Sequence, residues 1–98
     1  MENQLINNQE RKRYEYHVDG HIAFIDYLIA RGNIYLTHTE VPRSLGGRGI
    51  GKKLVLDVLT EIKEKTEYKL VPLCPFVAAY IKKNPEWKEI LSETVNIG

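Results

Sequence analysis

Glycines interleaved with cations at residues 46–53 constrain this chain more than any other feature. A strand-like run at residues 33–41 precedes this stretch, and a helix-like run at residues 51–64 follows it. In a strand–loop–helix unit, glycines let backbone N–H groups converge on an anion, and the helix N-terminus adds partial positive charge. Basic side chains lie in or beside the loop, namely Arg43, Arg48, Lys52 and Lys53. The sequence therefore predicts a binding site for a phosphorylated ligand.

Two common phosphate-binding loops fit this stretch poorly. The dinucleotide-binding fingerprint requires G-x-G-x-x-G, whereas these glycines alternate at 47, 49 and 51. The P-loop pattern G-x-x-x-x-G-K-[ST] is met from Gly46 to Lys52, but Lys53 replaces the hydroxyl residue that would hold magnesium. A chain of 98 residues also leaves little room for the large parallel sheet of a P-loop enzyme. A turn that merely connects a strand to a helix is the non-functional alternative, although such turns rarely need so many glycines and cations.

Three short motifs occur in order along the chain. They are His-Thr-Glu-Val-Pro at residues 38–42, Gly-Gly-Arg-Gly-Ile-Gly at 46–51, and Cys-Pro-Phe-Val-Ala-Ala-Tyr-Ile at 74–81, followed by Asn-Pro-Glu-Trp at 84–87. In these motifs the chain resembles the GNAT N-acetyltransferase superfamily, and specifically its short, single-domain YjdJ-type branch, from about Tyr14 to Trp87. Gly46 departs from the superfamily pattern, which usually has Gln or Arg there. The resemblance implies a minimal GNAT-like acyl-CoA N-acyltransferase fold and the transfer of an acetyl group from acetyl-CoA to an amine.

Hydrophobic periodicity predicts an α+β domain with a mixed sheet. Three strands form an antiparallel meander, a helix and a parallel strand follow by a right-handed crossover, and a second helix comes last. The predicted strands are residues 14–18, 21–30, 33–41 and 69–73, and the predicted helices are residues 51–64 and 75–83. We expect residues 87–91 to pack back onto the domain.

Length and composition favour a single domain over residues 11–98, preceded by a flexible tail at residues 1–10 that is rich in Asn and Gln. The formal net charge of +1 gives no general attraction to nucleic acid or to anionic membranes, so neither is expected as a partner. The chain has one cysteine, Cys74, and neither a secretory signal nor a long apolar span is visible, which favours a cytoplasmic location.

For the cofactor, the resemblance implies that the pantetheine arm of acetyl-CoA enters between the two parallel strands. The pyrophosphate would then rest on the glycine loop. The residues assigned to the cofactor in this way are Thr39, Val41, Gly46, Gly47, Arg48, Gly49, Ile50, Gly51, Lys52 and Phe76. No metal is expected.

His38 is the first catalytic candidate, because imidazole can accept a proton near neutral pH. By strand alternation His38 shares a face with Leu36 and Glu40, so His38 and Glu40 can both reach one reacting amine. A histidine that only hydrogen-bonds within the sheet is the alternative, and the resemblance favours the catalytic interpretation.

Cys74 and Tyr80 are catalytic candidates in addition to His38 and Glu40. Cys74 precedes a predicted helix N-terminus, where thiols are often reactive, although most free cysteines behave as small buried apolar residues. Tyr80 aligns with the superfamily tyrosine that protonates the departing CoA thiolate, and its alternative is a core aromatic. Direct attack of the amine on the thioester is favoured over a relay in which Cys74 is first acetylated.

The sequence therefore predicts an acetyl-CoA-dependent N-acetyltransferase. Its acceptor is an amine on a small molecule or a protein, and the sequence does not choose between them. A non-catalytic CoA-binding module, or a regulatory domain that depends on a partner, is the alternative interpretation.

Overall fold

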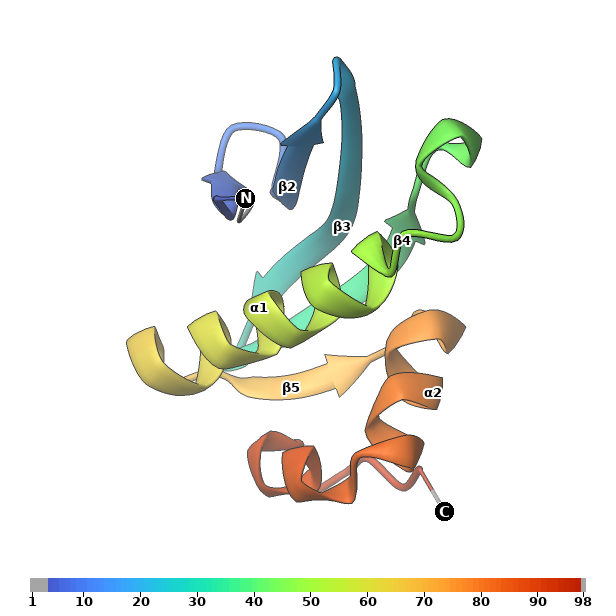
Figure 1. Cartoon of the computed structure of the whole chain (residues 1–98). Coiled ribbons are helices and arrows are strands. Elements are labelled where there is room, and N and C mark those ends of the chain that lie inside the picture. The colour runs from blue at the N-terminus through green and yellow to red at the C-terminus, as the bar shows by residue number, and fades with distance from the viewer. Residues whose placement is uncertain (1–3, 98) are drawn as a thin grey trace.

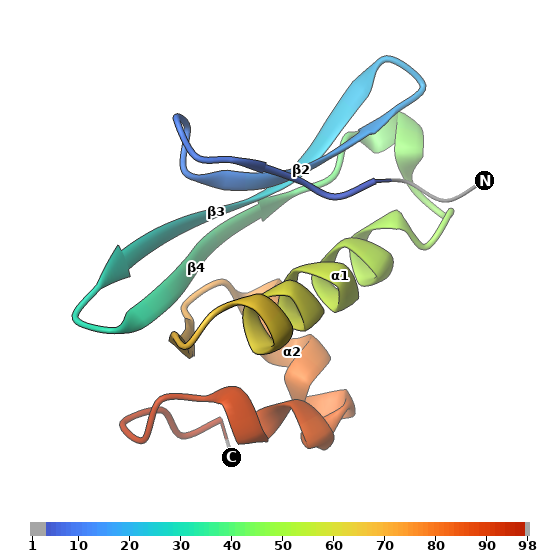
Figure 2. The same ribbon diagram turned by 90° about the vertical axis from the view of Figure 1, so that its left-hand side faces the viewer.

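The computed structural model describes residues 4–97, which form a five-stranded mixed sheet with two α-helices on one side (Figures 1 and 2). The strands are β1 (Ile6–Asn8), β2 (Arg13–Val18), β3 (His21–Ala30), β4 (Asn33–Glu40) and β5 (Lys69–Pro72), and they lie side by side in that order. The helices are α1 (Ile50–Lys65) and α2 (Pro75–Lys83), with short 3₁₀ segments η1 (Arg43–Leu45) and η2 (Pro85–Ile90). This arrangement confirms the predicted GNAT-like fold.

Strands β1 to β4 form an antiparallel meander, and β5 pairs parallel to β4. Two tight turns connect β2 to β3 and β3 to β4, with left-handed backbone at Asp19-Gly20 (φ 49° and 79°) and at Arg31-Gly32 (φ 54° and 80°). Positive φ at both central residues matches the turn to the right-handed twist of the strands. The predicted turns and the predicted parallel pair are therefore confirmed.

Helix α1 connects β4 to β5 along the chain. It packs on one face of the sheet because one of its own faces is apolar at the helical period. Its buried side chains are Ile50, Leu54, Val55, Val58, Leu59 and Ile62. They pack against β2 and β3, whose inward side chains include Tyr16 and Ile25, both fully buried. The hydroxyl of Tyr16 donates hydrogen bonds to Asp57 and to the carbonyl of Lys53, which fixes the N-terminal half of α1 over the sheet.

The C-terminal segment returns to the sheet, as predicted. Pro85 follows Asn84, the residue that ends α2, and starts η2. Leu91 then forms a parallel bridge with Leu70, and the Ser92 amide donates to the Leu70 carbonyl at 2.9 Å. Among residues 4–97, no helix is both long and apolar enough to cross a membrane.

The N-terminal segment differs from its prediction. The sequence predicts no element before residue 11, whereas Ile6–Asn8 forms β1 and pairs with Arg13–Glu15 of β2. Polar side chains hide this strand from a hydrophobicity pattern, because an edge strand needs only backbone partners on one side. Residues 1–3 of the predicted tail lie outside the described part of the chain.

A β-bulge at Thr37 corrects the predicted orientation of His38. Asp26 pairs with His38 and Tyr27 pairs with Leu36, so Thr37 is the extra residue in β4. Asp26 and Tyr27 are consecutive and point to opposite faces of the sheet, so Leu36 and His38 also lie on opposite faces. Leu36 is fully buried on the helix side of the sheet, whereas His38 is exposed on the other face. The prediction that His38 shares a face with Glu40 holds, and the prediction that it shares one with Leu36 is wrong.

The face opposite the helices contains a buried carboxylate, Glu15, which is 3% exposed. It accepts hydrogen bonds from Arg13 Nε (2.5 Å) and Asn8 Nδ2 (3.0 Å), and His17 Nε2 lies 2.8 Å from its other oxygen. Burial raises the pKa of Glu15, but the hydrogen bonds from His17, Arg13 and Asn8 outweigh burial and lower that pKa to about 2.

This depressed pKa predicts an acid-sensitive contribution to stability. Ionised Glu15 stabilises the fold above about pH 4.5, and the contribution is lost as pH falls toward about 2. Glu15→Gln should lower the free energy of unfolding by about 1–3 kcal/mol at pH 7, and the difference from the unsubstituted protein should shrink between pH 5 and 2. Urea unfolding at several pH values measures this. The exposed Glu93→Gln is the control, and a pH-independent difference would contradict the assignment.

Candidate functional site

Strands β4 and β5 stop pairing before β4 ends. Their last pair is Leu36–Pro72, and the Cys74 amide then donates to the Leu36 carbonyl at 2.9 Å. The Leu73 amide, which alternation along β5 would direct toward β4 like that of Lys69, instead turns back to the Val71 carbonyl at 3.1 Å. Strand β4 continues to Glu40 beyond this point. Backbone pairing between the strands therefore stops at their carboxyl ends, where ligands bind in open α/β sheets, and we call this unpaired region the slot.

The glycine loop lies beside this slot and leads into α1. Gly47 (φ 76°) and Gly49 (φ 72°) adopt left-handed backbone, and Gly49 is the N-cap of α1 without a side-chain cap. Within residues 4–97, no backbone carbonyl accepts a hydrogen bond from the amides of Gly47, Arg48 or Gly49. Gly46 differs, because its amide donates to the Arg43 carbonyl at 3.0 Å inside η1. The amides that the loop presents to an anion are therefore those of Gly47, Arg48 and Gly49, and the Gly46 amide is not among them.

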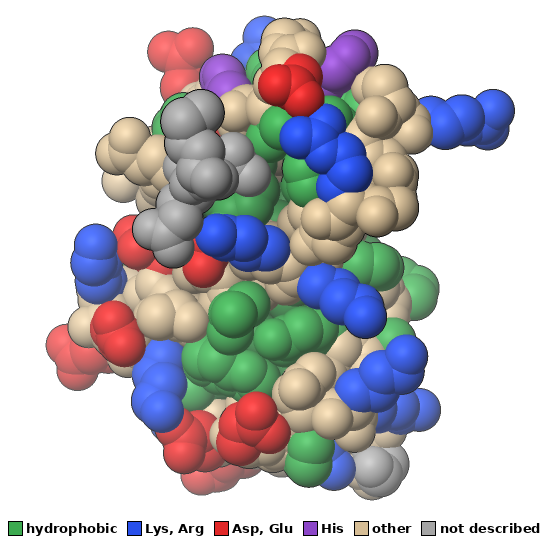
Figure 3. Space-filling model, in the orientation of Figure 1, with side chains coloured by type: hydrophobic (Ala, Val, Ile, Leu, Met, Phe, Trp, Pro, Cys, Tyr) green, Lys and Arg blue, Asp and Glu red, His purple; other side chains and the backbone are tan. Residues whose placement is uncertain are grey.

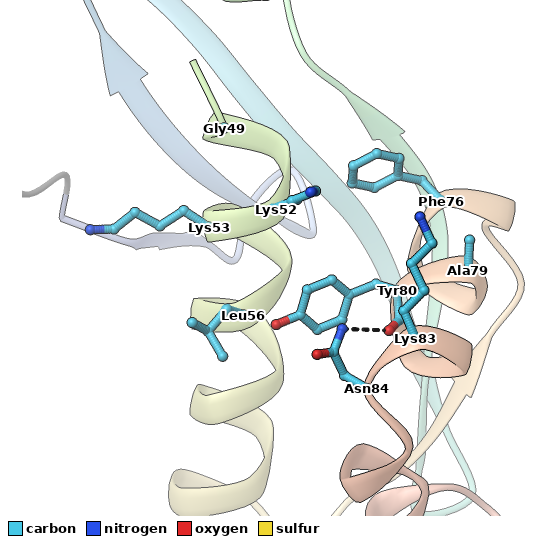
Figure 4. Close-up of a pocket in the computed structure, with 9 residues that line it drawn as sticks. All are labelled: Gly49, Lys52, Lys53, Leu56, Phe76, Ala79, Tyr80, Lys83 and Asn84. Carbon is cyan, nitrogen blue, oxygen red and sulfur yellow. Dashed lines mark hydrogen bonds between the residues drawn. The ribbon is translucent and has the colours of Figure 1, made fainter. Parts of the chain in front are cut away.

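The four predicted basic side chains do not converge. Arg48 Nη1 lies 2.7 Å from Asp19 Oδ2 in the β2–β3 turn, so this side chain points away from the slot. Arg43 is exposed on η1. Lys52 and Lys53 both line a cleft below the loop, and Figure 4 shows Lys52 pointing toward α2 while Lys53 extends in the opposite direction.

The cleft itself lies between α1 and α2 and has a volume of about 590 Å³. Its walls are formed by Gly49, Lys52, Lys53, Leu56, Phe76, Ala79, Tyr80, Lys83 and Asn84 (Figure 4). Figure 3 shows hydrophobic side chains gathered near the middle of this face, over α1, with Lys and Arg side chains at their border. An apolar floor with cations at one end suits a ligand that has an apolar arm and a phosphate group.

Phe76 closes the upper part of the cleft against the loop. Its ring lies so close to Gly51 that a Cβ atom there would meet Phe76 Cζ at 2.9 Å and Val41 Cγ2 at 3.4 Å. Glycine at position 51 therefore allows α2 to approach the first turn of α1. Val41, Gly51 and Phe76, all predicted to bind cofactor, are brought together.

Cys74 is buried at the slot rather than open to solvent. It is 5% exposed, and its thiol donates a hydrogen bond to Thr39 Oγ1 at 3.1 Å. Thr39 pairs with Ile25 and therefore faces the helical side of the sheet. The structure thus brings Cys74 and Thr39 together on the cleft side of β4.

His38 lies at the opposite mouth of the slot. Its Nε2 atom is 3.1 Å from Glu40 Oε1, and its ring centroid is 6.2 Å from that of Phe24. Both side chains are more than half exposed, at 57% for His38 and 60% for Glu40. His38 and Thr39 are consecutive in β4 and therefore lie on opposite faces of the sheet. Because Cys74 bonds Thr39, His38 and Cys74 lie on opposite sides of the slot.

Tyr80 lines the cleft, half-buried, from α2. Its ring reaches toward α1 with its hydroxyl directed toward Leu56 (Figure 4). Its carbonyl accepts hydrogen bonds from the Asn84 backbone amide (3.0 Å) and from Asn84 Nδ2 (2.9 Å), which fixes the end of α2.

Sequence reasoning missed Leu56, Lys83 and Asn84 as cleft residues. Lys83 points up the cleft toward Phe76, facing Lys52 from the other helix (Figure 4). The helical period offers a signal for this residue, because Phe76, Tyr80 and Lys83 are spaced by four and three residues and so share one face of α2.

Comparison with known proteins identifies relatives of the chain. A family model described as GCN5-related N-acetyl-transferase matches residues 13–90. Protein NATD1 of Xenopus tropicalis is 30% identical over 82 residues, which cover 78% of this chain and 73% of that protein. The matched range includes the slot, the loop and the cleft.

The burial of Cys74 can be tested by alkylation. We expect iodoacetamide to modify Cys74 much more slowly in the folded protein than in urea, because the thiol is 5% exposed and bonded to Thr39. Thr39→Ala should increase the rate, since it removes the acceptor hydroxyl and opens space. Thr37→Ala, at a neighbouring threonine that instead bonds the Asp26 carbonyl, is the control. Mass spectrometry follows the reaction, and equal rates in the folded and unfolded protein would contradict this placement.

Proposed function

The chain belongs to the GCN5-related N-acetyltransferase family, and from this premise we propose that it transfers an acetyl group from acetyl-CoA to an amine. The single observation that carries the proposal is the slot between β4 and β5, with the glycine loop and the cleft on one side and His38 on the other. We propose that the thioester lies at this slot, between a bound cofactor and an incoming nucleophile.

For the cofactor, we propose that its pyrophosphate accepts hydrogen bonds from the amides of Gly47, Arg48 and Gly49 and from the first turn of α1. Lys52 and Lys83 supply positive charge from both walls of the cleft. The pantetheine arm lies along Phe76, Ala79 and Leu56 and enters the slot near Thr39. Arg48 contributes its amide, because its side chain is engaged with Asp19.

For the chemistry, we propose direct transfer. The amine approaches from the His38 side and forms a bond to the carbonyl carbon of the thioester, the C–S bond to CoA breaks, and the amine gives a proton to His38 Nδ1, since Nε2 donates to Glu40. Glu40 holds the imidazole in position through the 3.1 Å contact. The alternative relay would require the Cys74 thiol to leave Thr39 and become acylated while buried, so the thiol is better explained as part of the wall.

Tyr80 is the predicted proton donor to the departing CoA thiolate. Tyr80 lines the same cleft, but its hydroxyl is directed toward Leu56. This orientation also favours a second candidate function, in which the chain binds CoA without turning it over. Binding of CoA without transfer to any member of an amine panel would support that second function.

Cofactor binding is tested by titration calorimetry with acetyl-CoA. Gly49→Glu should abolish binding, because a carboxylate would occupy the anion site. Lys52→Glu and Lys83→Glu should each weaken binding by about tenfold, since a partly screened charge contributes on the order of 1 kcal/mol. Lys69→Glu reverses an exposed charge at the far end of β5 and is the control. Unchanged affinity in Gly49→Glu would remove the loop from the proposal.

Catalysis is tested by steady-state kinetics of acetyl transfer. His38→Ala should lower kcat/KM by about 100-fold or more, the usual effect of losing a general base, with the Kd of CoA unchanged. Glu40→Gln should have a smaller effect, because it acts through His38. His21→Ala removes another exposed histidine and is the control. Loss of turnover in Cys74→Ala but not in His38→Ala would instead favour the relay.

A further inference from the structure

The tip of the glycine loop has one side chain through which the rest of the molecule can hold it. Leu45, which is 1% exposed, and Ile50, which is 7% exposed, fix the two ends of the loop in the core. Of the four exposed residues between them, three are glycine and the fourth is Arg48. Any side-chain contact that fixes the tip therefore involves Arg48.

The backbone of the loop tip is not held by hydrogen bonds of its own. Within residues 4–97, no backbone carbonyl accepts a hydrogen bond from the amides of Gly47, Arg48 or Gly49. Gly47 and Gly49 have φ of 76° and 72°, and a Cβ atom at either position would meet no heavy atom beyond its chain neighbours within 4 Å. Glycine loses more conformational freedom on ordering than any other residue, so ordering such a tip opposes the binding of an anion.

Arg48 is tied to a rigid point in another part of the chain. Its Nη1 atom donates a hydrogen bond to Asp19 Oδ2 at 2.7 Å, and Asp19 belongs to the β2–β3 turn, which lies beside the segment between β4 and α1 (Figure 2). That turn contains only Asp19 and Gly20 between two residues that are paired in register. The first of that pair, Val18, is 7% exposed and anchors the turn in the core. The ion pair thus connects the loop tip to an element that is ordered independently of the loop.

From this arrangement we propose that Asp19 is a positioning residue for the cofactor. Through Arg48, it holds the loop tip in the conformation that presents the amides of Gly47, Arg48 and Gly49 to the diphosphate of CoA. The Asp19 carboxylate does not touch the cofactor, and it acts by reducing the conformational freedom that the loop loses on binding. The proposal rests on the acetyl-CoA site proposed above and gives a role in it to a residue 29 positions away from Arg48.

The sign of the effect separates this role from direct binding of phosphate by the Arg48 side chain. If Arg48 left Asp19 to bind the diphosphate, the carboxylate would compete with the cofactor, and its removal would tighten binding. If the ion pair holds the loop, removal of the carboxylate weakens binding, even though the loop then carries more positive charge. The Arg48 and Asp19 side chains are 48% and 66% exposed, and exposed ion pairs are weak, so we expect an effect of about two- to fivefold.

Calorimetric titration with CoA measures this sign. Asp19→Asn should raise the Kd of CoA by about two- to fivefold, and the turn itself should persist, because Asn-Gly is favoured at its two central positions. On an Arg48→Gln background the same substitution should no longer weaken binding, since the ion pair is already lost. Glu67→Gln, which removes an exposed carboxylate between α1 and β5, is the control.

Unchanged or tighter binding of CoA to the Asp19→Asn variant would overturn the positioning role while leaving the proposed acetyl transfer intact. Absence of any heat with CoA in the unsubstituted protein would defeat the proposed function, and the positioning role with it. The two failures are therefore distinguishable in the same titration.

NMR relaxation of the free protein tests the same role without a ligand. We expect backbone order parameters near about 0.85 at Gly47, Arg48 and Gly49 in the unsubstituted protein and values below about 0.6 in Asp19→Asn. Order parameters in α1 and α2 should stay unchanged, which separates a local effect on the loop from a general loss of structure. Equal order parameters at the loop tip in both proteins would overturn the proposal.

Discussion

The hydrogen bond from the Cys74 amide to the Leu36 carbonyl is the last backbone hydrogen bond between β4 and the chain that follows β5, and the functional arrangement depends on where it falls. Before it, two parallel strands lie within one sheet with a buried core beneath them. After it, α2 begins at Pro75 and leads the chain away from β4, while β4 runs on to Glu40. A ladder longer by two pairs would close the slot and bury the backbone that a thioester needs to contact.

The same divergence sets the position of the proposed anion site. Because β4 continues past the last pair, the chain needs η1 and the glycine loop to reach the start of α1, and Leu45, 1% exposed, anchors that connection in the core. Gly49 then begins α1 without a side-chain cap, so its first amides face outward beside the cleft. Gly51 allows Phe76 to close on this turn. The anion site, the apolar cleft and the slot are thus consequences of one strand ending before its neighbour.

Periodic features could be predicted from the sequence because each residue in them meets the same environment as its neighbours. The apolar stripe of α1 belongs to this class. The left-handed turns at Gly20 and Gly32 and the parallel position of β5 could be predicted for another reason, because they follow from local turn residues and from the handedness of the crossover. The bulge at Thr37 belongs to neither group, since a single extra residue leaves no trace in an alternating pattern and yet moves His38 to the other face from Leu36. Pairings such as Arg48 with Asp19 depend on which loops meet in space, and spacing along the chain does not encode that.

The bulge also bears on the choice between mechanisms. Without it, His38 would lie on the face of Leu36, on the helix side of the sheet, and a base there would be shielded from any acceptor. With it, Thr39 and Cys74 border the cleft, while His38 and Glu40 border the opposite mouth. An acyl group on Cys74 would have to pass through the slot to reach an amine near His38. A thioester within the slot already faces that amine. Under the proposed function, the two-sided arrangement therefore favours attack by the amine on the thioester itself, because the proposed cofactor and acceptor sites lie on opposite sides of β4.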